Sequence, residues 1–398
     1  MTGHPFRLLP NPRHGVPGVV VLPEGGWRRA RAAITTWPGY APTPLHGLPD
    51  LTAALGLASV HLKDESPRFG LGSFKALGGA YAVSVVIARE LARRGVANAA
   101  SPAELESGRF AAETAVITVT CATDGNHGRS VAWGARRFGA RCVIFVHLGV
   151  SAGRREAMAA FGAEVREVPG NYDDSVRASE AAARDEGWLL VSDTSWPGYT
   201  ETPREVMQGY RLMAEEALDA LPAPPSHVFV QGGVGGVAAA VSVALRARHG
   251  TGPRLVVVEP ERAACLLASA EAGEPATVPG ELDTLMAGLA CGEPSLLAWG
   301  ELERAAFAFM AIPDSAAIAA MRLLARRAPP IEAGESGAAG LAGLALAARD
   351  GAARGALGLV PESRALVFST EGATDINLYE RLVSGPGVDT DPVSPLLG

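Results

Sequence analysis

The residues that could form a covalent bond with a carbonyl compound are few in this chain. Only Lys63 and Lys75 occur among the 35 lysine and arginine residues, and all the others are arginine. Arginine stays protonated, whereas a lysine amine can lose its proton and form an imine. In a chain that uses arginine almost everywhere, a remaining lysine is expected to stand at a position where arginine cannot perform the function. The alternative is that either lysine remains by chance. The search for an imine-forming residue is therefore reduced to two positions.

Lys75 has the sequence context of a reactive amine. It follows Ser73 and Phe74 at the end of the stretch DESPRFGLG and precedes ALGGAYAVSVVIARELARR, a pattern that predicts a helix. The positive end of the helix dipole disfavours an ammonium ion at the helix N-terminus, and an uncharged amine is the form that attacks an aldehyde. The alternative is a solvated surface lysine.

A glycine-rich loop lies farther along the chain. The sequence Gly232-Gly233-Val234-Gly235-Gly236 separates HVFVQ from an Ala/Val-rich helical stretch. Glycines let backbone N–H groups at the start of a helix approach a phosphate. The pattern Gly233-x-Gly235-x-x-Ala238, with Glu259 at the end of the next β-rich run as a ribose ligand, makes an NAD site an alternative. Close helix–strand packing without a ligand is a third interpretation.

A second polar loop, Thr123-Asp124-Gly125-Asn126-His127-Gly128, joins TAVITVT to a helical stretch. Its backbone N–H groups could hold a carboxylate, the amide of Asn126 could hydrogen-bond a ring hydroxyl, and Asp124 could transfer a proton. The alternatives are that Asp124 or Asn126 merely caps the helix and that His127 is structural.

Short β-rich runs alternate with Ala-rich helical stretches, and this alternation predicts an α/β fold with open, mostly parallel sheets. Ligands in such folds gather at the loops beyond the carboxyl ends of the strands, where the polar and glycine-rich loops fall. The stretch at 96–113 is expected to be a surface insertion and 221–226 a connector. The predicted strands are TAVITVT (114–120), RCVIFVHLG (141–149), HVFVQ (227–231), RLVVVEP (254–260) and RALVFST (364–370).

Composition excludes several classes of protein. A net charge of −7 argues against nucleic-acid binding and against a polybasic membrane anchor. No apolar run is long enough to span a membrane, and the N-terminus has no signal-peptide core. The four cysteines show no CxxC spacing, which disfavours a zinc site. We therefore expect a cytoplasmic, metal-independent enzyme, in which Cys265 and Cys291 are free thiols rather than a disulfide.

In combination and in this order, the motifs resemble those of the fold-type II pyridoxal-phosphate (PLP) enzymes, which include serine and threonine dehydratases, threonine synthase and cysteine synthase. SFK resembles their Schiff-base segment, DGNHG their substrate loop and GGVGG their phosphate cup. Within this family the resemblance is strongest to the diaminopropionate ammonia-lyases. The matching segments are KDESPRFGLGSFKALGGAYA (63–82), CATDGNHGR (121–129), NYDDSV (171–176), DTSWPGYTETPREVMQGY (193–210), LACGEPS (289–295), EAGESGAAGL (332–341) and STEGATD (369–375).

The resemblance implies a homodimer of two-domain subunits with PLP in the cleft between the domains. We expect residues 1–78 and 195–398 to form a large PLP-binding domain and residues 79–194 a small one. The implied reaction is the α,β-elimination of 2,3-diaminopropionate, a small amino acid, to pyruvate and two ammonia molecules. Leu77 stands where dehydratases usually have arginine, which weakens the alternative of a serine or threonine dehydratase. A PLP-binding protein without catalytic activity is a further alternative.

The resemblance also implies roles for individual residues. Lys75 would carry the cofactor and take the α-proton of the L-isomer, and Asp124 would be a second base. Asp193 would hold the β-ammonium group of the substrate, and its alternative role is an ordinary strand-end or helix-cap hydrogen bond. Cofactor contacts are expected from Phe74, Asn126, Gly232, Gly233, Val234, Gly235, Gly236 and from Ser369 or Thr370 at the pyridine nitrogen. Substrate contacts are expected from Thr123, Asp124, Gly125, Asn126, His127 and Asp193.

Overall fold

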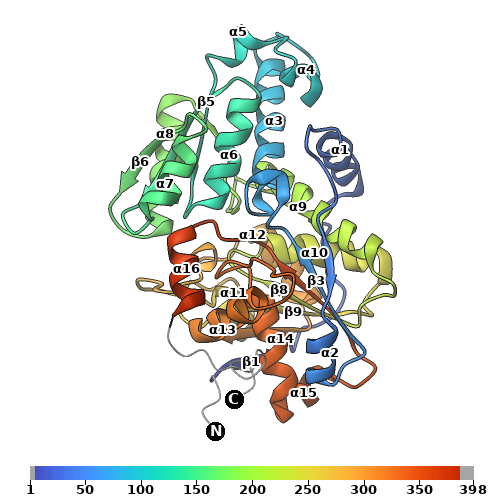
Figure 1. The fold of residues 1–398 in the computed structure, drawn as a ribbon. Helices are drawn as coiled ribbons and strands as arrows, with labels where there is room; N and C mark the ends of the chain where they lie inside the picture. The colour runs from blue at the N-terminus through green and yellow to red at the C-terminus, as the bar shows by residue number, and fades with distance from the viewer. Residues whose placement is uncertain (1–4, 386–398) are drawn as a thin grey trace. The chain divides into compact units, whose positions relative to one another are not determined.

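The structure, a computed structural model, describes residues 5–385 of the chain (Figure 1). The first four residues of the N-terminal stretch, for which no signal peptide is expected, lie outside this range. The described residues form two compact units. Unit 1 contains those up to Val21, Pro42–Phe74 and those from Met213 onward, and unit 2 contains Leu22–Ala41 and Lys75–Leu212. The domain boundaries expected after residues 78 and 194 stay a prediction.

The described part of unit 1 contains a seven-stranded sheet. Its five central strands are parallel, and the edge strands β1 and β2 run antiparallel to their neighbours. Leu62, Val367 and Phe229 lie side by side on three adjacent strands of the buried centre. The strands, in spatial order, are β1 (Arg7–Pro10), β10 (Ala308–Ile312), β9 (Arg254–Pro260), β8 (His227–Gln231), β11 (Arg364–Ser369), β3 (Ser59–Asp64) and β2 (Leu45–Gly47).

Helices of small residues cover this sheet. Helix α14 packs against β8, β9, β10 and β11 (Figure 1). A Cβ on its Gly340 would lie 2.9 Å from the carbonyl oxygen of Phe229, so the missing side chain allows this close approach. The helices of unit 1 are α2 (Pro49–Leu55), η1 (Arg68–Gly70), α10 (Gly236–His249), α11 (Cys265–Ala272), η2 (Ala287–Leu289), α12 (Leu296–Ala305), α13 (Asp314–Ala325), α14 (Ala339–Arg349), α15 (Gly351–Leu357) and α16 (Ile376–Ser384).

Unit 2 is built on a smaller sheet of four parallel strands, ordered β6, β5, β4 and β7. Helices α6 and α8 both pack against β4 and β5, and α3 packs on α6. The strands are β4 (Thr118–Ala122), β5 (Arg141–His147), β6 (Glu164–Val168) and β7 (Leu189–Leu190). The helices are α1 (Glu24–Ile34), α3 (Lys75–Arg93), α4 (Pro102–Glu106), α5 (Ala111–Thr114), α6 (Asn126–Arg137), α7 (Ala152–Ala159) and α8 (Tyr172–Glu186); α9 (Glu201–Ala220) begins in unit 2 and ends in unit 1.

These units confirm the predicted α/β class with mostly parallel sheets. The predicted strands at 227–231 and 254–260 match β8 and β9, whereas the strand predicted at 114–120 is wrong in its first half. Thr114 ends helix α5, and the chain turns before β4 begins at Thr118. The stretch at 96–113 contains the short helix α4 and most of α5. Among the described residues, no helix has the length and apolar character needed to cross a membrane.

Candidate active site

The two lysines have different surroundings. The amine of Lys63 is buried and donates hydrogen bonds to Glu216 and to the carbonyl oxygen of Thr43, both at 2.7 Å. The guanidinium of Arg68 joins Glu216 to Glu65 in the same buried network. Lys63 is therefore explained by an internal ion-pair network of unit 1, which leaves Lys75 as the candidate for carbonyl chemistry.

Lys75 is the first residue of α3, which confirms the predicted place near a helix N-terminus. Its carbonyl oxygen accepts a hydrogen bond of 2.7 Å from the hydroxyl of Ser130 on α6, which fixes the start of the helix. Its amine lies 5.6 Å from the centroid of the Tyr210 ring on α9 and forms an ion pair with Asp193. The side chain is 18% exposed, so it is mostly buried but still partly accessible to solvent.

Glycines bring α3 and α9 together around this lysine. A Cβ on Gly78 would lie 2.6 Å from the carbonyl oxygen of Val206, and a Cβ on Gly209 would lie 2.2 Å from that of Leu77. Real Cβ atoms do not tolerate such contacts, so both positions need glycine for this packing. The two helices approach backbone to backbone, and the Tyr210 ring is placed beside the amine of Lys75.

Asp193 lies in the segment after β7 and is 5% exposed. Its Oδ1 accepts a hydrogen bond of 3.3 Å from Tyr172, and its Oδ2 contacts the amine of Lys75. Burial opposes ionisation, but the neighbouring ammonium of Lys75 and the hydrogen bond from Tyr172 hold the pKa of Asp193 well below its usual range. Burial lowers the pKa of His127, and the cationic group that contacts Oδ2 of Asp193 is the amine of Lys75. The carboxylate thus favours the ammonium form of Lys75, against the helix dipole.

His127 is buried on the first turn of α6. Its Nε2 is 2.7 Å from the carbonyl oxygen of Val191, so this nitrogen carries the proton and donates it. Its Nδ1 therefore presents a lone pair and lies 3.8 Å from Oδ2 of Asp193. This arrangement supports a structural role for His127, because its hydrogen bond to Val191 connects the polar loop to the segment just before Asp193. Its predicted contact with substrate stays a prediction.

Thr123 organises the polar loop from within. Its hydroxyl oxygen accepts hydrogen bonds from the N–H groups of Gly125 and Gly128, at 2.9 and 3.0 Å. Gly125 has a φ of +149°, a conformation that favours glycine. The first turn of a helix leaves N–H groups without intrahelical acceptors. Thr123 therefore binds two N–H groups at this helix start, in the loop that the sequence predicts to hold a carboxylate.

Asp124, the predicted second base, is half-buried beside the imidazole of His147. The distance between Oδ1 of Asp124 and Nε2 of His147 is 2.9 Å. Sequence analysis did not identify His147. Its place at the end of β5, on the sheet edge where Asp124 follows β4, is a signal that could have found it.

The glycine loop of unit 1 connects β8 to α10 and has the shape of a phosphate cradle. Gly233 and Gly235 have φ values of +59° and +97°, which non-glycine residues rarely adopt. A Cβ on Gly232 would lie 2.6 Å from Cγ of Glu259. Substitution at these positions would therefore distort the loop, in which the N–H of Gly232 donates to the carbonyl oxygen of Val258 and that of Gly235 to the carbonyl oxygen of Gly232. A glycine loop at the start of a helix is the kind of backbone that can bind a phosphate.

Glu259 is unsuited to the ribose role that the NAD alternative requires. It is fully buried, and its two carboxyl oxygens accept hydrogen bonds of 2.8 Å from the N–H groups of Leu266 and Leu267 at the start of α11. Burial raises the pKa of Glu259 to about 8, although these two bonds oppose the shift. The parallel β8–α10–β9 arrangement also occurs in nucleotide-binding units. Here, however, Glu259 binds the N-terminus of α11 and is not available to a ribose.

The remaining predicted cofactor contacts lie where β11 ends. Ser369 and Thr370 are both buried, and the hydroxyl of Ser369 donates a hydrogen bond of 3.4 Å to the carbonyl oxygen of Glu371. The N–H of Phe74 donates to the carbonyl oxygen of Thr370 at 3.0 Å. The SFK segment is therefore attached to the end of β11 just before α3 begins. Which hydroxyl faces the pyridine nitrogen stays a prediction.

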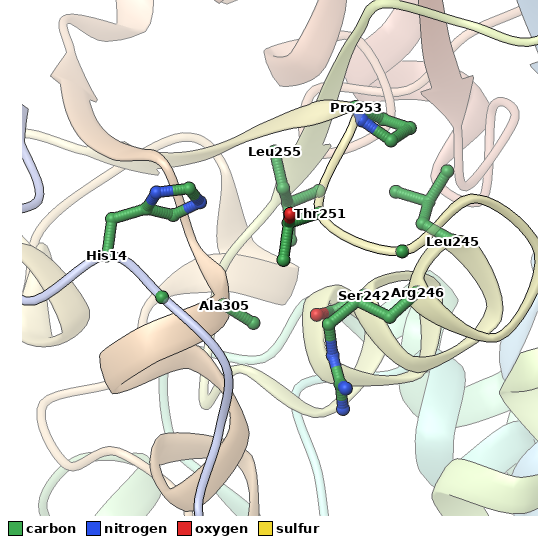
Figure 2. A pocket seen from close by; sticks show the side chains of 10 residues that line it. His14, Ser242, Leu245, Arg246, Thr251, Pro253, Leu255 and Ala305 are labelled. Carbon is green, nitrogen blue, oxygen red and sulfur yellow. The ribbon is translucent and has the colours of Figure 1, made fainter.

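Three residues near the candidate site were missed besides His147: Ser130, Tyr172 and Tyr210. Tyr172 lies in the segment NYDDSV, where Asn171 caps α8. A pocket in unit 1 between His14, Ser242, Arg246 and Thr251 contains none of the predicted site residues (Figure 2). All four cysteines are buried thiols in the described part of the chain, as expected for Cys265 and Cys291, and none forms a disulfide there.

Comparison with known proteins agrees with this geometry. Residues 36–361 match the model of the family described as pyridoxal-phosphate dependent enzyme. The chain is 40% identical over 362 residues to diaminopropionate ammonia-lyase of Salmonella typhimurium, covering 87% of this chain and 89% of the relative. It is 38% identical over 359 residues to the enzyme of the same name from Escherichia coli K12, covering 87% and 88%.

Solved structures give the same result. The crystal structure of Escherichia coli diaminopropionate ammonia-lyase in complex with D-serine matches with a TM-score of 0.87 and 35% identity, over 96% of this chain and 97% of that one. Threonine deaminase isoform 2 from Solanum lycopersicum matches with a TM-score of 0.71 at 20% identity, over 96% and 98% of the two chains, and this likeness shows the fold alone.

Proposed function

This chain belongs to the family of pyridoxal-phosphate dependent enzymes, and we propose that it cleaves 2,3-diaminopropionate to pyruvate and two molecules of ammonia. Two similar relatives carry the name of this activity and align with most of the chain. The ion pair of Lys75 with Asp193 in unit 2 and the glycine loop of unit 1 each support the assignment. The roles of the individual residues below are part of the proposal.

The observation that carries the substrate assignment is the contact of Asp193 with a primary ammonium group. The buried carboxylate of Asp193 contacts the amine of Lys75 and accepts a hydrogen bond from Tyr172. Diaminopropionate differs from serine in having a β-ammonium group in place of a hydroxyl. A carboxylate that already binds one alkylammonium ion is suited to bind the other. A serine or threonine dehydratase would have no need of a buried negative charge there.

The residues of each unit, taken separately, suit one part of PLP. Lys75 would supply the amine that bonds the cofactor aldehyde, and the loop from Gly232 to Gly236 would hold the phosphate. Asn126 would hydrogen-bond the ring hydroxyl, and Ser369 or Thr370 would face the ring nitrogen. When bound, PLP withdraws the electron pair that the α-carbon of the substrate retains after losing its proton. The protein itself orients the bonds and moves the protons.

Each acid–base residue then has one task. Lys75, when its amine is free, would take the α-proton of the L-isomer. Asp124 takes the α-proton of the D-isomer, which points to the opposite face. Asp193 keeps the β-amino group protonated, so that it leaves as neutral ammonia. The relative crystallised with D-serine binds an amino acid of D configuration, which supports a pocket open to that isomer.

A substrate panel tests this proposal. The PLP-loaded protein is incubated with each enantiomer of 2,3-diaminopropionate, serine and threonine, and pyruvate or 2-oxobutanoate is measured together with ammonia. We expect faster turnover of diaminopropionate than of serine or threonine, with two ammonia molecules per pyruvate. Faster turnover of serine or threonine would assign the chain to the dehydratases, and no turnover of any substrate would favour a PLP-binding protein without catalytic activity.

We also propose that the protein is a homodimer acting in the cytoplasm. The exposed side chains of Val16, Val19 and Val20, at 67, 53 and 78% exposure, form an apolar stretch in unit 1 that a second subunit could cover. The four buried cysteines form no disulfide among the described residues, which is compatible with a reducing compartment. Light scattering after size-exclusion chromatography should give twice the mass of the chain, and a monomer mass would contradict the dimer.

A further inference from the structure

We propose that His147 is a positioning residue, which holds the carboxylate of Asp124 in place as the base for the D-isomer. This inference rests on the proposed function, because it assigns a partner to one of the two proposed bases. His147 touches neither of the two groups that bond the cofactor and the substrate in that proposal, Lys75 and Asp193, by any contact that the described residues show. Its effect would pass through Asp124.

The fold places the two residues at the same edge of the sheet of unit 2. Strands β4 and β5 are parallel neighbours, with Ala122 opposite Phe145. His147 is the last residue of β5, and Asp124 follows the end of β4 by two residues. Parallel strands end at the same edge, so residues separated by 23 positions in the sequence meet there. The contact therefore depends on the two strands that carry it.

Hydrogen bonds on both ring nitrogens fix the proton of His147. The N–H of Gly149 donates to Nδ1 at 3.1 Å, so this nitrogen presents its lone pair. In the neutral ring the proton then lies on Nε2 and is donated to Oδ1 of Asp124 at 2.9 Å. The bond to Asp124 raises the pKa of His147, but a second proton would sit on Nδ1 and face the N–H of Gly149. The neutral ring is the form that satisfies both contacts.

The loop after β5 is shaped around this ring. A Cβ on Gly149 would lie 2.9 Å from Cε1 and 3.0 Å from Nδ1 of His147. A side chain at position 149 would push the ring of His147 away from this position, so glycine suits the contact. The imidazole is therefore held on one side by Gly149 while its other nitrogen donates to Asp124. This is the arrangement of a fixed donor rather than of a proton relay.

A fixed donor on Oδ1 orients the carboxylate of Asp124. Rotation of the carboxylate would break a hydrogen bond to a charged group, and such bonds are among the stronger ones in proteins. The second oxygen of the carboxylate then keeps one direction from one turnover to the next. A base must lie within hydrogen-bond reach of the proton it removes, so loss of this orientation lowers the rate for the isomer that depends on Asp124.

The test compares His147→Leu, which removes the donor, with His147→Gln, whose side-chain amide N–H can replace Nε2–H. His61→Leu is the matched control, because His61 is a half-buried histidine of unit 1 outside the proposed site. For each PLP-loaded variant, kcat and KM are measured with D- and L-diaminopropionate. We expect His147→Leu to lower kcat for the D-isomer by about 10-fold or more, the effect of one lost hydrogen bond to a charge. The L-isomer should change by less than about 3-fold, and His147→Gln should recover most of the D-activity.

Other results would overturn the inference. Equal losses for both isomers in His147→Leu would show a merely structural role, and unchanged D-activity would show no role at all. Wild-type protein that cleaves the L-isomer but not the D-isomer would also refute the positioning role, while the proposed function would stand. Failure of the wild-type protein on both isomers would refute the proposed function itself.

Discussion

The ammonium of Lys75 and the carboxylate of Asp193 form an ion pair within unit 2, although the two residues are separated by 118 positions in the sequence. The pair joins the residue proposed to carry the cofactor to the residue proposed to recognise the substrate. Bonding of the cofactor to Lys75 would remove the ammonium that Asp193 binds. The carboxylate would then be available to the β-ammonium group of diaminopropionate, so one buried charge serves two cations in succession.

Replacement of Lys75 by alanine should remove the covalent cofactor and abolish turnover. The other lysine, Lys63, has its amine committed to Glu216 and to the carbonyl oxygen of Thr43. Borohydride reduction of the PLP-loaded wild-type protein followed by peptide mass spectrometry should place the cofactor on Lys75. Cofactor recovered on Lys63, or full activity of the alanine variant, would contradict the assignment.

Replacement of Lys63 by methionine should instead destabilise unit 1 and leave the chemistry intact. The substitution removes one cation from a buried network and leaves Glu216 paired with Arg68 alone. Such a change typically lowers the free energy of unfolding by roughly 3 kcal/mol. We expect a lower midpoint of urea unfolding for the cofactor-free protein. The folded variant should keep the visible absorption band of bound PLP. Loss of that band without a change in the unfolding midpoint would show that Lys63 takes part in cofactor binding.

Replacement of Asp124 by asparagine should affect the two enantiomers unequally. Lys75 can reach the α-proton on one face only, so the D-isomer depends on Asp124 in the proposed mechanism. Loss of a general base typically lowers the rate by about 100-fold or more. We expect that loss in kcat/KM for D-diaminopropionate, with much of the L-activity retained. Comparable losses for both isomers would indicate a role in binding or loop geometry, and full retention of both would leave Asp124 without a catalytic role. The helix-cap alternative for Asp124 is wrong, because Gly125 is the N-cap of α6.

Glu259 should make stability depend on pH. Its pKa is raised from 4.5 to about 8 in the folded protein, chiefly by burial, so the folded state retains a proton that the unfolded state has lost over this range. Stability therefore falls as the pH rises from about 4.5 to about 8. In Glu259→Gln this contribution disappears, whatever the change in absolute stability. The free energy of unfolding of the variant, relative to wild type, should increase between pH 5 and pH 8, and parallel pH profiles would contradict the buried, protonated carboxyl.

The sequence predicts the α/β class, the helix that begins at Lys75 and the positions of the glycine and polar loops, because these depend on local patterns. Residue-to-residue contacts depend on the tertiary structure, and sequence analysis missed them. Tyr172 donates to Asp193 from 21 positions away, and His147 donates to Asp124 across two parallel strands. The close packing of Gly78 against the backbone of Val206 could not be predicted either, because a glycine inside a helix does not indicate which other segment packs against it.

The most direct test of the central claim is the ratio of kcat/KM for diaminopropionate to kcat/KM for serine, measured in the wild-type protein and in Asp193→Asn. The asparagine side chain is close in size to aspartate but lacks the charge that binds an ammonium group. We predict that the ratio falls by at least about 10-fold in the variant, because a charge-assisted hydrogen bond is lost with one substrate only. The visible absorption band of PLP should be retained as evidence of an intact site. An unchanged ratio would contradict recognition of the β-ammonium group by Asp193, and with it the proposed basis on which the chain selects diaminopropionate over serine.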